Sequence, residues 1–203
     1  MLQMGPPAET ERADAARNRA LILAAAHGIL RNQGIDALTM DAVAHEAGLG
    51  KGTVFRRFGS RRQLLQTMLN DSEAEFQRAF LLGPPPLGPD APPVERLIAF
   101  GRARFDLVAT QGPLLRAAED SPAGRFSSPA RDAMGLHISV LLRAAQVEGD
   151  IAVLALSLLS LFEAGFVMHS VENDSVSLAR LADGWEDLVR RVTVNPPPRA
   201  PGS

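Results

Sequence analysis

The segment Gly48–Leu65, GLGKGTVFRRFGSRRQLL, concentrates cationic side chains. Five of the chain's 21 lysine and arginine residues, its single lysine among them, lie within residues 51–62. Both side chains bind phosphate, and arginine also forms paired hydrogen bonds with base edges of DNA. The whole chain has a formal net charge of −2, so the positive charge is local. The chemistry that this segment predicts is recognition of a polyanion such as a nucleic acid.

Two short helices around a glycine turn are expected to position these cations. The first begins at Thr39, a good N-cap, and ends by Gly48, and the second spans residues 51–58. Val54 and Phe58 lie four residues apart, so they bury one face of the second helix and leave the opposite face outward. Two short helices joined by such a turn form a helix-turn-helix.

Three helix starts in this region offer groups that bind anions. The first amides of a helix lack partners and its dipole is positive there, so a helix start attracts phosphate. Thr39, Lys51 and the pair Ser60–Arg61 stand at these starts, at a spacing suited to successive phosphates of DNA. The alternative is a solvated basic face on an ordinary helical bundle. A nucleotide-hydrolysing phosphate loop does not fit, because the spacing around Lys51 differs and no strand precedes it.

The sequence pattern of the remainder of the chain predicts helices throughout. Apolar residues recur every three to four positions, and no run alternates as a strand does. Prolines in Gly83–Pro93 interrupt the series because proline removes a backbone donor. We therefore expect an all-α protein of about nine helices. The expected helices span residues 15–32, 39–47, 51–58, 60–82, 94–110, 113–118, 128–147, 150–170 and 177–194.

Several classes of chemistry find no support in the residues. Cysteine is absent, which excludes disulfides, thiol catalysis and cysteine metal sites. The four histidines lack metal-ligand spacing, and no nucleophile–base set is present, so we expect no catalytic residue, metal, cofactor or enzymatic activity. The apolar run 151–169 is interrupted by Ser157, Ser160 and Glu163, which favours a buried helix over a membrane span. With no signal peptide at the N-terminus, we expect a cytoplasmic protein.

Residues 18–69 resemble a known family. The stretch Ile22–Leu65, ILAAAHGILRNQGIDALTMDAVAHEAGLGKGTVFRRFGSRRQLL, is similar to the DNA-binding domain of the tetracycline-repressor (TetR) family of bacterial regulators in motif order and helix length. The resemblance covers roughly a quarter of the chain. It implies a dimeric, all-α repressor with a three-helix DNA-binding domain and a divergent helical ligand domain.

The resemblance assigns DNA contacts by position. Lys51 and Gly52 fall where family members touch base edges, and five further matched positions usually contact DNA, mainly phosphate. Phe55 stands where the family commonly has tyrosine, so it keeps apolar contact but loses a hydrogen bond; Arg57 stands where histidine is frequent. The expected DNA-binding residues are Thr39, Lys51, Gly52, Thr53, Phe55, Arg56, Arg57, Ser60 and Arg61.

Charge supports a division into two parts. Residues 1–70 carry nine basic and six acidic side chains, a net of +3, whereas residues 71–203 carry twelve and seventeen, a net of −5. We expect a disordered arm over 1–14, the DNA-binding domain over 15–70, a helical effector-binding and dimerisation domain over 71–194, and a disordered tail over 195–203.

The sequence of the second domain contains no readable motif, but its apolar patterning predicts a pocket and a dimer interface. Polar residues set among apolar ones frame the expected pocket, whose few aromatic residues favour a largely apolar effector. A single bundle can cover the apolar helix 150–170, but a dimer interface that also uses the apolar face of helix 177–194 covers it better, and the family resemblance implies such a four-helix arrangement. Trp185 is either an interface anchor or a core residue. The pocket candidates are Phe100, Arg104, Met134, His137, Phe162, Glu163 and Phe166.

These observations predict a DNA-binding transcriptional regulator. The expected partners are a double-stranded DNA operator, a second copy of the chain and an unidentified small effector that releases the repressor from DNA; no membrane partner is expected. The alternatives are a ligand-independent or activating regulator and, more remotely, an enzyme tethered to DNA.

Overall fold

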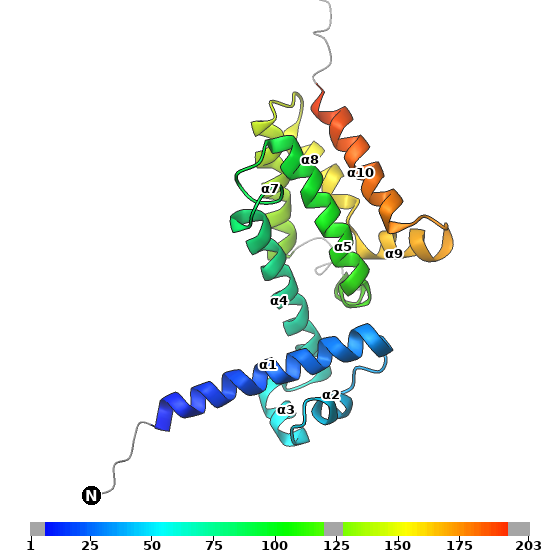
Figure 1. The fold of residues 1–203 in the computed structure, drawn as a ribbon. Coiled ribbons are helices and arrows are strands. Elements are labelled where there is room, and N and C mark those ends of the chain that lie inside the picture. Colours follow the sequence, from blue (N-terminus) through cyan, green and yellow to red (C-terminus); the bar gives the residue numbers. More distant parts are fainter. Residues whose placement is uncertain (1–6, 120–127, 195–203) are drawn as a thin grey trace, which may run out of the picture. The chain divides into compact units, whose positions relative to one another are not determined.

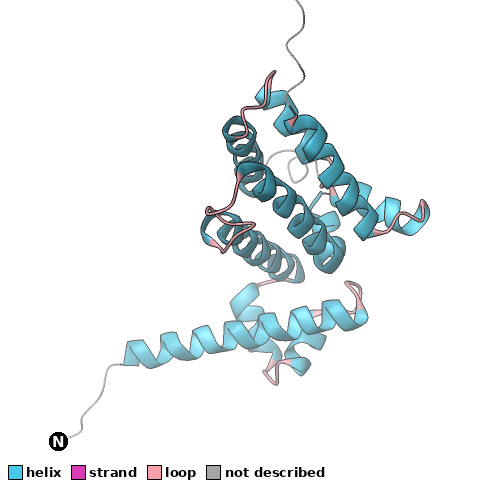
Figure 2. Cartoon of the chain, turned by 45° about the horizontal axis from the view of Figure 1, so that its top comes forward, coloured by secondary structure: helices cyan, strands magenta, loops and turns pink. Residues whose placement is uncertain are grey.

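The computed structural model describes residues 7–119 and 128–194, with side chains from residue 12 to 116 and from 128 to 194. These residues form nine helices and no strand (Figure 2), so the expected all-α class is confirmed. Among the described helices, none is by itself long and apolar enough to cross a membrane; α8 and α9 pass that test only as a bent pair.

Two compact units divide the chain between Asn70 and Asp71. The boundary falls inside α4, whose first residues belong to unit 1 and whose last residues belong to unit 2. Unit 1 contains α1 (Pro7–Gln33), α2 (Met40–Glu46), α3 (Lys51–Phe58) and the start of α4 (Arg61–Leu82). Unit 2 contains the rest of α4, α5 (Pro93–Glu119), α7 (Pro129–Ala144), α8 (Ile151–Ser160), α9 (Ala164–Asn173) and α10 (Leu178–Thr193) (Figure 1).

Local signals set the helix ends of unit 1. The Thr39 hydroxyl accepts a hydrogen bond from the amide of Ala42 at 3.1 Å, which caps α2 as predicted. Gly48, at φ +64°, makes the turn before α3, and Gly59, at φ +72°, ends α3, in a region that other residues rarely adopt. The Ser60 hydroxyl then accepts from the amide of Gln63 at 3.3 Å, the expected capping arrangement of α4.

Helix α1 is longer than the sequence predicted. It begins at Pro7, so residues 7–14 are helical and not part of a disordered arm; residues 1–6 lie outside the described range. Proline is favoured at the first helical position because its missing amide would have no partner there. The following residues, AETERADAARNRA, are mostly alanine, glutamate and arginine, which are strong helix formers and extend the helix.

Unit 2 is built around α5, against which α7, α9 and α10 pack. Trp185 of α10 is 2% exposed and its indole nitrogen donates to the carbonyl of Leu97 at 3.0 Å, so it is a core residue. A Cβ added to Gly101 would lie 2.1 Å from that indole, which shows how closely α5 and α10 approach. Other aromatic rings complete this core: Phe76, Phe80, Phe100, Phe105 and Phe162.

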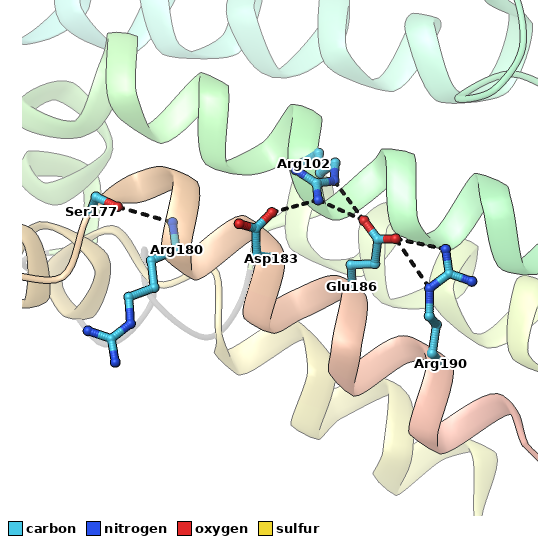
Figure 3. Close-up of polar contacts among 6 residues, drawn as sticks. All are labelled: Arg102, Ser177, Arg180, Asp183, Glu186 and Arg190. Carbon is cyan, nitrogen blue, oxygen red and sulfur yellow. Dashed lines mark hydrogen bonds and ion pairs between the residues drawn. The ribbon is translucent and has the colours of Figure 1, made fainter.

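Ion pairs between partly exposed side chains join α10 to α5 (Figure 3). Arg102 donates to Asp183 at 2.8 Å and to Glu186 at 2.7 Å, and Glu186 also accepts from Arg190 at 2.7 Å. The hydrogen bond from Arg102, followed by that from Arg190, holds the pKa of Glu186 below its usual range. The α10 surface next to α5 therefore carries charges that are already neutralised.

Two predicted helix boundaries are wrong in unit 2. Helix α5 continues through Pro113, where the sequence predicted a break between 94–110 and 113–118. Proline removes one helical hydrogen bond, but Leu114 and Leu115 are buried immediately after it, and this packing keeps the segment helical.

The second difference is a break in the predicted helix 150–170. Helices α8 and α9 meet at a 45° bend. At the bend, the amides of Leu161, Phe162 and Glu163 bond carbonyls three residues back, the tighter geometry of a helix end. The bend coincides with Phe162, which is 3% exposed and packs 4.7 Å from the Trp185 ring, so core packing accounts for it.

Candidate functional site

Helix α3 buries one apolar face in the interior of unit 1 and exposes the opposite face to solvent. Val54 is fully buried and Phe58 is 7% exposed, so the predicted anchors do hold the helix. Lys51, Arg56 and Arg57 are exposed. Neither Arg56 nor Arg57 has a hydrogen bond or ion pair with any described residue. The outward face of α3 therefore carries two cations to which none of the described residues supplies a counter-charge.

Two apolar positions on α3 have no structural reason to be exposed or small. Phe55 is 46% exposed, although an aromatic ring on a short helix would gain by burial. A Cβ added to Gly52 would meet nothing within 4 Å, so packing within the protein does not require glycine there. Both features fit a surface that a large molecule approaches closely.

The three helix starts differ in how their amides are satisfied. Thr39 caps α2 and Ser60 caps α4, so the hydroxyl of each already accepts a hydrogen bond from a backbone amide of its helix. Helix α3 begins after Gly50, and no side chain caps it. Its first amides point from an uncapped start, which is the arrangement that favours a bound anion.

Lys51 at that start is held by a carboxylate. Its ammonium forms an ion pair with Asp41 of α2, and both side chains are more than half exposed. An exposed pair of this kind contributes little to stability and is exchanged readily. Lys51 is therefore positioned at the start of α3 without being immobilised there.

Arg61 differs from the other predicted DNA-binding arginines. Its Nε donates to the carbonyl of Leu38 at 2.7 Å, and its Nη2 donates to that of Ile35 at 2.6 Å. These bonds tie the start of α4 to the loop before α2. The predicted DNA contact of Arg61 stays a prediction, alongside a clear role in fixing the helix-turn-helix.

A hollow beside α3 contains residues that the sequence did not predict. It is lined by Phe58 and Gln63 and by Arg57, the one expected contact among its lining residues. Arg19 is separated from Arg57 by more than 30 residues, so no local motif joins them. The lining residues missed from the sequence are Arg19, Gln63, Gln66 and Thr67.

The predicted effector residues do not all come together. Five of them are buried in the core of unit 2, but Phe166 is 53% exposed and Glu163 is part-buried, 3.9 Å from Arg131. Phe166 therefore does not lie in the buried group. The five buried candidates are Phe100, Arg104, Met134, His137 and Phe162.

Buried polar groups mark the same core. Arg104 donates to Glu73 at 2.8 Å, with side chains that are 5% and 12% exposed, and its guanidinium lies 5.7 Å from the centre of the Phe76 ring. The His137 ring lies 4.3 Å from that of Phe80, and its Nε2 has no hydrogen-bond partner among the described residues. Burial, and then the charge of Arg96, lower the pKa of His137 to about 4, so its ring is neutral near pH 7.

No group of three or more histidine, aspartate or glutamate side chains among the described residues is placed to hold a metal ion. The chemistry of the described surfaces is thus that of cationic and amide groups on α3, and of aromatic rings with a few buried polar atoms in unit 2.

Comparison with known proteins bears on the helix-turn-helix first. Residues 22–68, from α1 to the start of α4, match the family described as bacterial regulatory proteins, tetR family. These residues therefore form a TetR-family DNA-binding domain. Over 103 residues it is 30% identical to the DNA-binding transcriptional repressor TetR of Mycobacteroides abscessus, covering 51% of this chain and 45% of that protein. The chain spans less than half the length of the curated relatives it matches.

Solved structures extend the TetR-like fold to both units. A TetR-family transcriptional regulator from Pectobacterium atrosepticum is 23% identical, with a TM-score of 0.66 over 92% of this chain and 99% of that one. The TetR-family repressor FadR of Thermus thermophilus, solved with lauroyl-CoA, is 20% identical, with a TM-score of 0.56 over 91% and 100%. At these identities the likeness shows the fold.

Proposed function

We propose that this protein is a TetR-family transcriptional repressor that binds double-stranded operator DNA and is released by a small effector. Its place of action is then the cytoplasm, where bacterial DNA lies, and it needs no catalytic activity. The observation that carries the proposal is the outward face of α3, where Arg56 and Arg57 are exposed, without an ion pair to any part of the chain that the structure describes, on a helix whose start has no side-chain cap.

The α3 face has the features needed for a major-groove contact. Arginine can pair with phosphate or with the O6 and N7 atoms of guanine, and Phe55 can contact a thymine methyl. The open space around Gly52 allows the backbone to come close to base edges. Thr39, Ser60 and Arg61 flank this face as further candidates for phosphate contact.

The effector belongs to the buried core of unit 2. That core consists of aliphatic side chains and a cluster of aromatic rings, which favours a small, largely apolar molecule. The lauroyl-CoA in the Thermus thermophilus structure is one ligand with such an apolar part. The Nε atom of Arg104 and the Nε2 atom of His137 have no partner among the described residues and are available to a polar group of that molecule.

Helix α4 provides the connection between effector and DNA. The second half of α4 contributes Phe76 and Phe80 to the buried core of unit 2, and its first residue, Arg61, bonds to the loop before α2. Coupling of this kind is typically about 1–3 kcal/mol and is reciprocal, so DNA should weaken effector binding by the same factor.

We further propose that the protein acts as a homodimer. Two α3 helices on one dimer would read half-sites about 34–36 Å apart, or a multiple of that distance.

The direct test is the affinity for duplex DNA from upstream of its own gene, measured by fluorescence anisotropy. The double variant Arg56→Ala/Arg57→Ala should bind at least about 100-fold more weakly, because it removes two charge-assisted hydrogen bonds from each half-site. The control, Arg78→Ala/Arg180→Ala, removes the same charge from exposed positions of unit 2 and should bind normally. Equal affinities of the two double variants would contradict the proposal.

A further inference from the structure

Two polar side chains of unit 2 lie against Phe80, and each has a buried nitrogen without a partner. Arg96 of α5 donates from Nη2 to the carbonyl of Phe80 at 3.2 Å, but its Nε has no hydrogen-bond partner among the described residues. His137 of α7 is 6% exposed, its ring centre lies 4.3 Å from that of Phe80, and its Nε2 has no described partner either. We call these two residues the Arg96–His137 corner. Buried nitrogens of this kind are rare in proteins and require an explanation.

The corner carries a positive charge that no described carboxylate balances. The other guanidinium of this core, that of Arg104, is paired with Glu73 at 2.8 Å. Arg96 has no ion pair with any residue that the structure describes. Its charge acts on the neighbouring ring, since burial and then Arg96 lower the pKa of His137. A part-buried cation without a counter-charge costs stability, and an anion placed beside it removes that cost.

Apolar rings adjoin the corner. The Phe100 ring lies 5.3 Å from that of His137 and 5.2 Å from that of Phe76, and Phe76 in turn lies 5.3 Å from Phe80. A molecule with a head group at the corner therefore has aromatic surface next to it for an apolar body. This combination of many apolar contacts with a few polar ones is typical of small-molecule sites.

The charge at the corner discriminates among possible head groups. A cationic head group is repelled by the Arg96 guanidinium. A neutral carbonyl or hydroxyl oxygen satisfies one unpaired nitrogen but leaves the charge of Arg96 unbalanced. A carboxylate has two oxygens, so it accepts from both side chains and supplies the missing negative charge.

We propose that the effector is a small organic acid whose carboxylate binds the Arg96–His137 corner. The carboxylate accepts hydrogen bonds from Nε of Arg96 and from Nε2 of His137, which donates when the single proton of the neutral ring is on that atom. The apolar part of the acid lies among the neighbouring phenylalanine rings. The inference rests on the effector of the proposed function and names its chemical class.

The test compares acids with their neutral amides near pH 7, where the acids are ionised. The full chain is titrated with octanoate and octanamide, and with phenylacetate and phenylacetamide, by isothermal titration calorimetry. At least one acid should bind about tenfold or more tightly than its amide, because a charge-assisted hydrogen bond is lost in the amide. If neither acid binds, or if both amides bind as tightly as their acids, the acidic class is wrong.

The single tryptophan locates the binding. Trp185 is buried in the same core, its ring 4.7 Å from that of Phe162, which lies 6.0 Å from Phe100. Binding of the acid should therefore change the tryptophan fluorescence, with the same dissociation constant as calorimetry gives. An acid that binds without any change in this fluorescence would contradict a site in this core.

Substitutions at the corner identify the head-group contacts. Arg96→Gln should weaken the acid about tenfold or more and leave the amide within about threefold, whereas Arg78→Gln, an equal charge change at an exposed position of α4, should alter neither. His137→Phe keeps a ring beside Phe80 and removes the unpaired Nε2, so it should weaken the acid but raise the melting temperature of the unliganded protein. Unchanged acid affinity in both corner variants would overturn this site.

DNA binding separates this inference from the proposed function. Without acid, Arg96→Gln and His137→Phe should bind duplex DNA as the unmodified protein does. With acid, the unmodified protein should leave the DNA at concentrations that do not release Arg96→Gln. An acid that binds at the corner without releasing DNA would leave the site standing and overturn release by effector, whereas a protein that binds DNA but none of the acids would overturn only the site.

Discussion

The two units use the same side chain in opposite ways. In unit 2, several of the described arginines lie beside carboxylates, among them Arg102 with Asp183 and Glu186, and Arg104 with Glu73. In unit 1, Arg56 and Arg57 are exposed without a described counter-charge. The contrast separates charge that holds the fold from charge that is available to a partner.

The same contrast explains the overall balance of charge. Residues 71–203 have a net charge of −5 and contain paired arginines, whereas residues 1–70 have a net charge of +3 and include Arg56 and Arg57 on the outward face of α3. Unpaired like charges on a small surface repel one another, so their persistence in unit 1 is a cost to the isolated protein. A polyanionic partner removes that cost.

The largest expected effect is a loss of stability when the ion pair of a buried arginine is removed. Arg104→Met leaves the Glu73 carboxylate buried and unpaired, and should lower the free energy of unfolding by about 3–5 kcal/mol. Arg57→Met, the matched change in unit 1, should alter it by less than about 0.5 kcal/mol. Urea denaturation followed by circular dichroism measures both, and similar losses of stability in the two variants would erase the distinction between the units.

The second prediction concerns pH and the core of unit 2. The pKa of His137 is lowered to about 4 in the folded state, whereas an unfolded histidine titrates near 6.5. As pH falls from 6.5 to 4, the unfolded state binds a proton first, so stability is present above pH 6.5 and declines below it, by roughly 3 kcal/mol in total.

A substitution isolates this dependence. His137→Gln should flatten the change in unfolding free energy between pH 6.5 and 4, whereas His45→Gln, at an exposed position in unit 1, should leave it as it was. Denaturation series at several pH values provide the measurement. An unaltered pH dependence in His137→Gln would mean that another group is responsible.

The smallest expected effects come from glycine-to-alanine substitutions, which compare how tightly the two units are packed. Gly101→Ala forces a methyl group against the Trp185 indole and should destabilise by about 1–3 kcal/mol. Gly28→Ala in α1 meets nothing within 4 Å and should stabilise by about 0.5–1 kcal/mol, because alanine favours helix. Thermal melts of both variants suffice, and a stabilising Gly101→Ala would show that α5 and α10 are more loosely packed than described.

Sequence reasoning succeeded where structure is fixed locally. The boundaries of α2 and α3 follow from Thr39, Gly48 and Phe58, since caps and turns depend on neighbouring residues. The break between α8 and α9 did not show in the periodicity, because it depends on Phe162 entering a core built from distant helices. The continuation of α5 through Pro113 has the same origin.

The candidate site divides in the same way. The outward position of Arg56 and Arg57 followed from the burial of Val54 and Phe58 on one short helix. The bonds of Arg61 to carbonyls of Leu38 and Ile35 could not be predicted, because they join segments more than 20 residues apart. The hollow beside α3 depends on a similar long-range meeting, that of Arg19 with Arg57.

The salt dependence of DNA affinity tests the central claim most directly, namely that the exposed arginines of α3, Arg56 and Arg57, bind phosphates or bases. For the unmodified protein, the logarithm of the affinity should fall linearly with the logarithm of salt concentration, with a slope of about −0.9 for each phosphate neutralised. Arg56→Ala/Arg57→Ala should make the slope shallower by about one for each phosphate that is no longer neutralised, while Arg78→Ala/Arg180→Ala keeps it unchanged. A slope near zero in the unmodified protein, or one that the α3 variant leaves as steep as before, would contradict the account.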